Sequence, residues 1–293
     1  MPVGSGETWA LSLMVATLYS ATPLVLAALG GVLSERAGVI NIALEGLILA
    51  GAFVGAWAGQ SAPIMGLAGA VLAGALIGLL HAFLTQTLRM NPVVSGLGIT
   101  LLASGVTRYL ALRWFEQGFR IDGLPGGLFL GLALILPFVT LLVLHRTRFG
   151  VRLRAVGENP ESARMAGVAP VPLRYLAVTL SGVLAALAGA YLSMSDAHTF
   201  SSNMSAGKGY IALAAVIFGK WHPLGASLGA LFFGFFYAVQ TQLQISGVQV
   251  HWLGVEWTSP FLLDCLPYLM TLAALVSVVG RAVPPAALGK EVE

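Results

Sequence analysis

Residues 38–58 read GVINIALEGLILAGAFVGAWA, and Glu45 is the only charged side chain among them. A helix that crosses the hydrocarbon core of a bilayer needs about 20 mainly apolar residues. This stretch has that length and composition, and comparable stretches recur along the rest of the chain. The sequence therefore predicts an all-α, polytopic transmembrane helical bundle, with residues 1–293 forming a single transmembrane domain.

The composition of the whole chain agrees with this fold class. Of its 293 residues, 57% are hydrophobic and 9% are charged, whereas a soluble domain carries about 25% charged residues. The net charge of +3 is too small for a phosphate-binding patch, so no nucleic-acid partner is expected. The single cysteine, Cys265, excludes an intrachain disulfide and a cysteine-based zinc site.

We expect eight full spans and one half-length segment, the latter at residues 210–219. The full spans are expected at residues 9–29, 38–58, 63–88, 92–112, 127–144, 173–193, 223–242 and 260–280. Residues 1–8 contain no Lys or Arg, and the apolar stretch that follows is as long as a span. The first segment is therefore expected to be an uncleaved span and not a secretory signal.

The distribution of positive charge predicts the orientation. The segment 146–174 contains six arginines, and loops rich in Lys and Arg stay in the cytoplasm. Counting spans outward from this segment places eleven of the 15 basic residues inside. The four placed outside are Arg108, Arg113, Arg120 and Lys208. We therefore expect an external N-terminus and a cytoplasmic C-terminus.

Small residues and a short repeat indicate how the helices are arranged. Glycines recur four residues apart at 51, 55 and 59, at 74 and 78, and at 225 and 229, which allows close helix packing. Packing within one bundle is preferred here to a dimer seam. Residues 38–43 (GVINIA) and 209–214 (GYIALA) share the pattern Gly-x-Ile-x-(Ile/Leu)-Ala, and each is expected to open a helix. The first copy would enter from the inside and the second from the outside. The sequence thus predicts inverted repeats with broken helices.

The basic segment also contains a short helix signal. Asn159 can cap a helix, Pro160 suits its first position, and Gly167 can close it. Two turns that expose Ala163, Met165 and Ala166 to the cytosol would be too short to be stable alone, so this helix is expected to dock on a partner. A plain solvated loop is the alternative. The residues of the signal are Gly157, Glu158, Asn159, Pro160, Glu161, Ser162, Ala163, Arg164, Met165, Ala166, Gly167 and Val168.

This loop resembles the coupling helix of the permease subunits of bacterial ABC importers. Residues 37–46 (AGVINIALEG) resemble a motif of the simple-sugar and nucleoside branch, the ribose-permease-like branch, and are most similar to permeases of nucleoside importers. Residues 207–223 (GKGYIALAAVIFGKWHP) resemble the second motif of that branch. Branched-chain amino-acid permeases are similar but more distant. Where ribose-type relatives most often have ten spans, nine segments are found here, which leaves open a re-entrant piece at residues 245–258.

The resemblance implies a subunit of a larger machine in the bacterial plasma membrane. The implied partners are a second permease (a paralogue or a copy of this chain), a cytoplasmic ABC ATPase and an extracytoplasmic substrate-binding lipoprotein. No cofactor is expected, because ATP would be bound by the ATPase. In agreement, the chain has no Gly-x-x-x-x-Gly-Lys-(Ser/Thr) motif. Its histidines are scattered without metal-ligand spacing, so no metal site is expected.

Four polar residues are candidates for the translocation pathway: Asn41, Glu45, Asn91 and Ser95. Glu45 is an acid within a span, and Asn41 would lie four residues earlier on the same helix face. This pair could bind a ribose hydroxyl, or it could join the broken helix to its neighbour. Asn91 and Ser95 could belong to an inner gate or to a plain turn. Asp264 is expected to be an interfacial anchor.

Two classes of function remain to be compared. The first is the permease of an ATP-driven importer of nucleosides or related sugars. The second is a secondary transporter, which would couple to H⁺ or Na⁺ through buried acids and would need no cytoplasmic docking helix. An intramembrane enzyme lacks a nucleophile and base at recognisable spacing.

Overall fold

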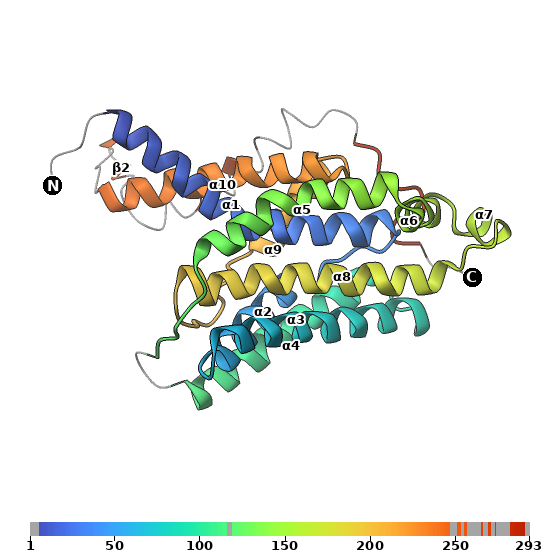
Figure 1. The fold of residues 1–293 in the computed structure, drawn as a ribbon, viewed down its shortest axis with the longest axis horizontal. Helices are drawn as coiled ribbons and strands as arrows, with labels where there is room; N and C mark the ends of the chain where they lie inside the picture. Colours follow the sequence, from blue (N-terminus) through green and yellow to red (C-terminus); the bar gives the residue numbers. More distant parts are fainter. Residues whose placement is uncertain are drawn as a thin grey trace.

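The computed structural model describes residues 6–115, 119–246, 251–252, 255–256, 265, 269–270, 273 and 282–290. Its helices run between the two ends of an elongated bundle (Figure 1). Helix α1 (Gly6–Arg36) starts at one end. Helix α6 (Arg148–Glu158), helix α7 (Pro160–Met165) and residues 282–290 lie at the other end.

Within the described residues, six helices are long and apolar enough to cross a membrane. They are α1, α3 (Pro63–Ala82) with the π-helical turn η1 (Phe83–Thr87), α4 (Pro92–Trp114), α5 (Gly126–Arg146), α8 (Pro170–Tyr191) with the turn η2 (Leu192–Asp196), and α10 (Pro223–Ser246). Two apolar helices are shorter, namely α2 (Leu44–Gly59) and α9 (Lys208–Phe218). These elements confirm the all-α transmembrane bundle.

Strands contribute little to the described part of the chain. Strands β1 (His251–Trp252) and β2 (Val255–Glu256) pair antiparallel over two residues each, within the stretch where a re-entrant piece was left open. The span expected at residues 260–280 falls outside the described residues, apart from 265, 269–270 and 273. Asp264 also lies outside them.

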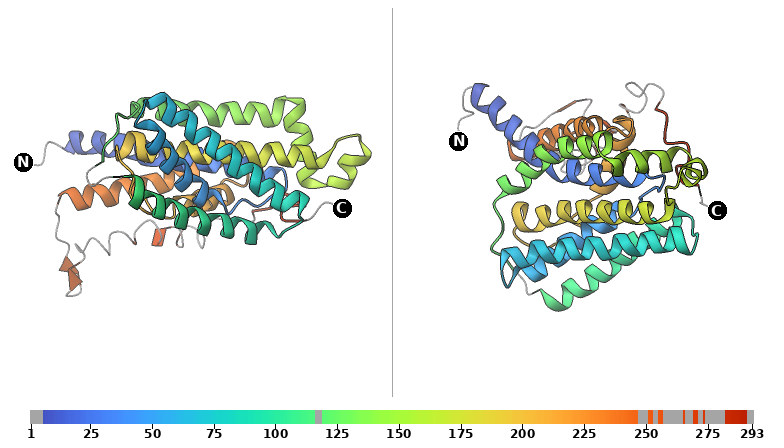
Figure 2. Two further views of the ribbon diagram at one scale, coloured as in Figure 1. Left: turned by 90° about the horizontal axis from the view of Figure 1, so that it is seen from below. Right: turned by 45° about the vertical axis from the view of Figure 1, so that its right-hand side comes forward.

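Six of the helices form two matching sets of three: α1, α2 and α3 make one set, and α8, α9 and α10 make the other. Helix α1 packs on α10, and its counterpart α8 packs on α3; likewise α9 packs on α1, and α2 packs on α8. Figures 1 and 2 show α1 and α8 side by side in the centre, with α10 beyond α1 and α3 beyond α8. Each set thus consists of a long helix, a half-length helix and a long helix. This reciprocal packing is the arrangement expected of inverted repeats with broken helices.

The expectations that residues 38–43 open a helix and that residues 38–58 form a full span were wrong, because α2 begins only at Leu44 and has 16 residues. Gly38 has φ +91°, which takes the chain out of the helical region. The next carbonyls then find partners outside a helix: Ser34 donates its hydroxyl to the Val39 carbonyl at 2.8 Å, and a His81 ring nitrogen lies 3.3 Å from the Ile40 carbonyl. The second copy of the pattern is helical, as expected, and lies in α9.

Glycines allow the helices of the two sets to touch through their backbones. A Cβ on Gly51 would overlap the main chain of Ala186, and a Cβ on Gly74 would overlap the carbonyl of Gly182. Both contacts lie within this chain and on α8, which confirms the predicted packing within one bundle. Close backbone approach of this kind gives dispersion contacts, which hold membrane helices together where lipid supplies no hydrophobic drive.

This packing makes a direct prediction for Gly74→Ala. The added methyl group has no space, so the replacement should destabilise the purified protein by about 1–3 kcal/mol, measured as a lower Tm in detergent. Gly105→Ala in α4 is the matched control, since a Cβ there meets nothing within 4 Å. Equal Tm values for the two variants would contradict the packing.

Candidate functional site

The half-length helices α2 and α9 begin against each other, and the carboxylate of Glu45 joins them. Glu45 Oε1 accepts a hydrogen bond from the backbone N–H of Gly207 at 2.8 Å, and Oε2 accepts one from Gly209 at 2.7 Å. Glu45 lies in the first turn of α2, and the two glycines flank the first residue of α9. The negative charge thus sits at the N-terminal ends of both helices, where free N–H groups and the helix dipoles favour an anion. We call this contact the crossing.

Two glycines make the crossing possible. Gly207 has φ +77°, a left-handed conformation that turns the chain into α9. A Cβ on Gly209 would overlap the main chain of Glu45. The Gly-Lys-Gly sequence that opens α9 is therefore needed for the carboxylate to reach both N–H groups.

The crossing lies deep within the bundle. With a rise of about 1.5 Å per residue, the 11 residues of α9 extend roughly 16 Å from the crossing to the turn after Phe218. That turn is at the α6–α7 end, since Arg36 Nε donates to the Trp221 carbonyl at 2.8 Å. Because the hydrocarbon core is about 30 Å thick, the crossing falls near its middle. Lys208, which the charge count placed on the outer side, thus opens a helix that starts within the bundle.

Asn41 does not share a helix face with Glu45, contrary to expectation, because it precedes α2 in the non-helical segment. Its amide Nδ2 donates to the hydroxyl of Ser181 in α8 at 2.8 Å. Asn41 is fully buried, and its Oδ1 has no hydrogen-bond partner among the described residues. The side chain thus ties the segment before α2 to α8 and leaves one buried acceptor unused.

Ser95 joins the same segment from another side. Its hydroxyl lies 2.9 Å from Nδ1 of His81, whose other ring nitrogen faces the Ile40 carbonyl. This chain of contacts links α3, α4 and the segment before α2. Asn91 has a different role, because its Oδ1 accepts from the N–H of Val93 at 2.9 Å and caps α4 at the surface.

Sequence reasoning missed Arg174, which counted only as one of the loop charges. Its side chain is 1% exposed in the first turns of α8. Nε donates to the Ala37 carbonyl at 3.0 Å, and Nη1 donates to Gln86 Oε1 at 3.3 Å and to the Lys290 carbonyl at 3.1 Å. The only signal in the sequence is a lone charge between Leu173 and Tyr175, just inside a predicted span.

Residues 285–290 lie along the same end of the bundle. The N–H of Ala287 donates to the Gly157 carbonyl at 2.9 Å, and the N–H of Gly289 donates to the Gly38 carbonyl at 2.9 Å. This segment therefore connects the end of α6 with the start of the non-helical segment before α2. Together with Arg174, it connects the residues just before α7 with the non-helical segment before α2, which leads to the crossing.

A second buried acid, Glu35, was also missed, because the first span was expected to end at residue 29. Glu35 is 3% exposed, and the indole Nε1 of Trp221 donates to its Oε2. This contact fixes the turn between α9 and α10 to the end of α1. In the same turn, burial lowers the pKa of His222, and the nearby charges of His145 and Arg36 lower it further. His222 therefore adds no positive charge here at neutral pH.

Helix α7 forms as the sequence predicts. Asn159 Oδ1 accepts from the N–H of Ser162 at 2.9 Å, Pro160 is its first residue, and Gly167 has φ +79°. The N–H of Val168 bonds the Ala163 carbonyl and that of Gly167 bonds the Arg164 carbonyl, which closes the helix in a Schellman motif.

Two details around α7 differ from expectation. The residues before it are not a loop, since α6 covers most of the basic run and includes Gly157 and Glu158. Ala163 is 4% exposed and not open to solvent, because α7 packs on α6 and α8. The apolar side chain that α7 does present outward is Met165, which is 93% exposed.

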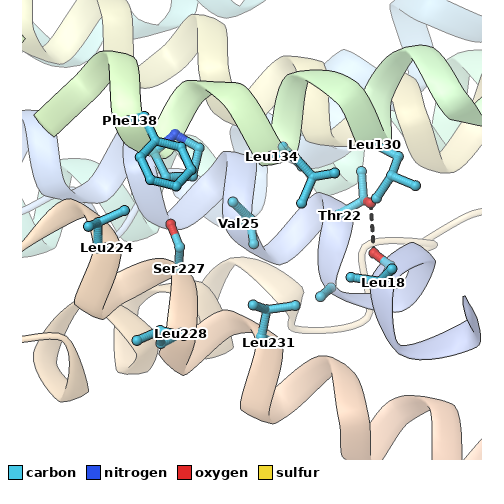
Figure 3. Close-up of a pocket in the computed structure, with 13 residues that line it drawn as sticks. Leu18, Thr22, Val25, Leu130, Leu134, Phe138, Leu224, Ser227, Leu228 and Leu231 are labelled. Carbon is cyan, nitrogen blue, oxygen red and sulfur yellow. Dashed lines mark hydrogen bonds between the residues drawn. The ribbon is translucent and has the colours of Figure 1, made fainter. Parts of the chain in front are cut away.

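An apolar cavity of about 310 Å³ lies between α1, α5 and α10 (Figure 3). Of the residues that line it, only Thr22 and Ser227 carry polar side chains. Both hydroxyls donate to carbonyls of their own helices, at 2.8 Å and 2.9 Å. The cavity therefore offers little to a polar ligand. Among the residues that the structure describes, no group of His, Cys, Asp and Glu could hold a metal ion.

Comparisons with known proteins point to one family. The chain is 38% identical to the guanosine ABC transporter permease protein NupQ of Bacillus subtilis, over 95% of this chain and 96% of that protein. It is 35% identical to the nucleoside ABC transporter permease protein NupC of Lactococcus lactis, with the same coverage. A permease protein ascribed to a glucose ABC transporter of Haloferax volcanii is 34% identical, over 96% and 97% of the two chains.

A solved structure supports the fold. It is described as a metal-chelate type ABC transporter in an inward-facing conformation, and it matches with a TM-score of 0.54 at 15% identity, over 95% of this chain and 92% of the other. The model of the family described as "Branched-chain amino acid transport system / permease component" matches residues 13–275. The chain therefore belongs to this family of multi-pass membrane permeases.

Proposed function

We propose that this chain is the membrane-spanning subunit of an ATP-driven importer whose cargo is a nucleoside. The observation that carries the proposal is the similarity to guanosine and nucleoside permeases along almost the whole chain. The glucose-type relative makes a simple sugar the second candidate. The chain itself is a transport subunit and not an enzyme.

The proposed assembly contains three further components. They are a second permease (a copy of this chain or a paralogue), a cytoplasmic ABC ATPase that binds ATP, and an extracytoplasmic binding lipoprotein. The absence of a nucleotide-binding motif from the sequence supports a separate ATPase. Helix α7, with the exposed Met165, is the proposed contact with that ATPase, in the segment Gly157 to Val168.

The proposed location is the bacterial plasma membrane, with the N-terminus outside and the C-terminus in the cytoplasm. The basic residues support this orientation. The arginines of α6, together with Arg36, Arg174 and Lys290, gather at the end of the bundle opposite the start of α1. Positive charge favours the cytoplasmic side of a membrane.

The four polar candidates would serve the pathway in different ways. Glu45 would hold α2 and α9 in register as a positioning residue, because its two oxygens are already engaged. Asn41 and Ser95 would fix the segment before α2 on the cytoplasmic side of the crossing. Asn91 would set the start of α4 through its cap.

The function can be tested with the complete complex in sealed vesicles. Vesicles that contain the permease and its ATPase, with the binding lipoprotein on the outer side, should take up labelled guanosine only when ATP is supplied to the ATPase. Uptake should persist when protonophores or sodium removal collapse the ion gradients. Uptake that follows an ion gradient and ignores ATP would establish a secondary carrier instead.

The role of α7 can be tested with Met165→Glu. Because this side chain is almost fully exposed, the change should leave the Tm of the permease within about 1 °C while co-purification with the ATPase falls severalfold. The buried Ala163 is unsuitable, since a charge there would disturb the packing of the permease itself. Met65→Glu, an exposed methionine in the first turn of α3, is the control. Unchanged co-purification and uptake in Met165→Glu would remove α7 from the interface.

The role of Glu45 can be tested with Glu45→Gln and Glu45→Ala. Hydrogen bonds to a charged group contribute about 1.5–3 kcal/mol each, and in glutamine one of the two accepting oxygens is replaced by an amide nitrogen, which cannot accept. We expect a lower Tm and reduced uptake in Glu45→Gln, and a larger loss of both in Glu45→Ala. Asp122→Asn, an exposed acid after α4, should change neither quantity. Wild-type stability and uptake in both Glu45 variants would refute the role of the crossing.

A further inference from the structure

The first turn of α9 carries a charged residue in the middle of the bundle. Lys208 is half-buried, and its Nζ lies 5.4 Å from the centre of the Tyr237 ring in α10. The carboxyl groups of Asp196 and Glu45 are near enough to act on it electrostatically. A lysine at this depth is costly unless it meets water, polar groups or a ligand. The ring and the two acids compensate part of that cost.

Tyr210, two residues after Lys208, faces α4, whereas Lys208 faces α10. The Tyr210 hydroxyl lies near the side chain of Thr100 in α4, whose own hydroxyl donates to the Gly96 carbonyl at 3.0 Å. The main chain of Thr100 lies against Gly46, the residue after Glu45. Tyr210 is therefore at the level of the crossing, yet 43% of its side chain is exposed.

Together these residues form a polar belt across an apolar face. The belt consists of Tyr210, Lys208 and Tyr237, with the buried Thr100 of α4 beside Tyr210. The neighbouring exposed side chains of α4 are apolar, for example Leu97 and Leu101. A face that contacted lipid alone would not carry an ammonium group and a half-exposed phenol at mid-membrane depth. Polar groups placed in this way are typical of a water-filled pathway.

We infer that Lys208 and Tyr210 contact the transported molecule as it crosses the centre of the membrane and contribute to its selection. The inference rests on the proposed function and names the substrate chemistry at this position. The ammonium group donates to hydroxyl oxygens of a ribose, and the exposed phenol ring offers a face on which a nucleobase stacks. A neutral nucleoside supplies both groups.

The test compares maximal uptake rates of guanosine, adenosine, uridine and cytidine by the complete complex. Maximal rates are used because the external lipoprotein is expected to set the half-saturating concentration. Lys208→Met should lower the rates about tenfold or more, and Lys208→Arg should restore part of the loss. Tyr210→Leu should change the ratio of purine to pyrimidine rates, whereas Tyr210→Phe keeps the ring and should retain the wild-type ratio.

Controls separate this role from a structural one. Lys220→Met is the control for Lys208→Met and removes an exposed lysine at the far end of α9. Tyr109→Leu is the control for Tyr210→Leu and removes an exposed tyrosine ring from α4. Both controls should keep wild-type rates and ratios. A structural role would lower all four rates by one factor together with the Tm, and that result would overturn the inference, as would unchanged rates and ratios. If Lys208→Met fails to insert into the membrane, the maximal rates of Lys208→Arg and the purine-to-pyrimidine ratios of the two Tyr210 variants test the inference instead.

The outcomes also separate this inference from the proposed function. ATP-dependent guanosine uptake by the wild type, with rates and ratios unaltered in the variants, would leave the function standing and reject the contact. Absence of nucleoside uptake by the wild-type complex would instead reject the proposed function.

Discussion

The carboxylate of Glu45 is the constraint around which this bundle is arranged. A helix that starts within a membrane exposes backbone N–H groups that lipid cannot satisfy. Two such helices start at the crossing, and one carboxylate accepts from two N–H groups of α9 while lying in the first turn of α2. The interaction also offsets the cost of burying a charge, since both helix dipoles present their positive ends to it. Removing the carboxylate would leave α9 without partners for those two groups.

Contacts across the bundle connect the crossing with the end that carries α7. Arg174 holds the Ala37 carbonyl, Gln86 and the Lys290 carbonyl, while the segment 285–290 joins Gly157 to Gly38. Glycine contacts on α8 keep α2 and α3 at backbone distance. A displacement at the base of α7 would therefore reach the segment before α2 through hydrogen bonds and direct packing, without a flexible linker between them.

Much of this fold follows from sequence patterns that act locally. Apolar length predicts the spans, the early stop at Gly219 and Pro223 predicts the half-length α9, and Asn159, Pro160 and Gly167 predict α7. What escapes prediction depends on contacts between distant segments. Residues 38–43 leave the helix because His81 and Ser34 satisfy their carbonyls, and Ala163 is buried because α7 folds onto α6 and α8. In the sequence, Arg174 and Lys208 cannot be distinguished from ordinary loop charges, because their burial depends on the packing of the whole bundle.

We expect the crossing to stay fixed while the rest of the permease rocks around it, as in transporters with inverted repeats. Electron cryomicroscopy of the complete complex with its ATPase, without nucleotide and with ATP, tests this claim most directly. Helix α7 should occupy a groove of the ATPase in both states, and Glu45 should stay within about 3 Å of the N–H groups of Gly207 and Gly209. Separation of α2 from α9 between the two states, or an α7 that remains in solvent, would contradict it.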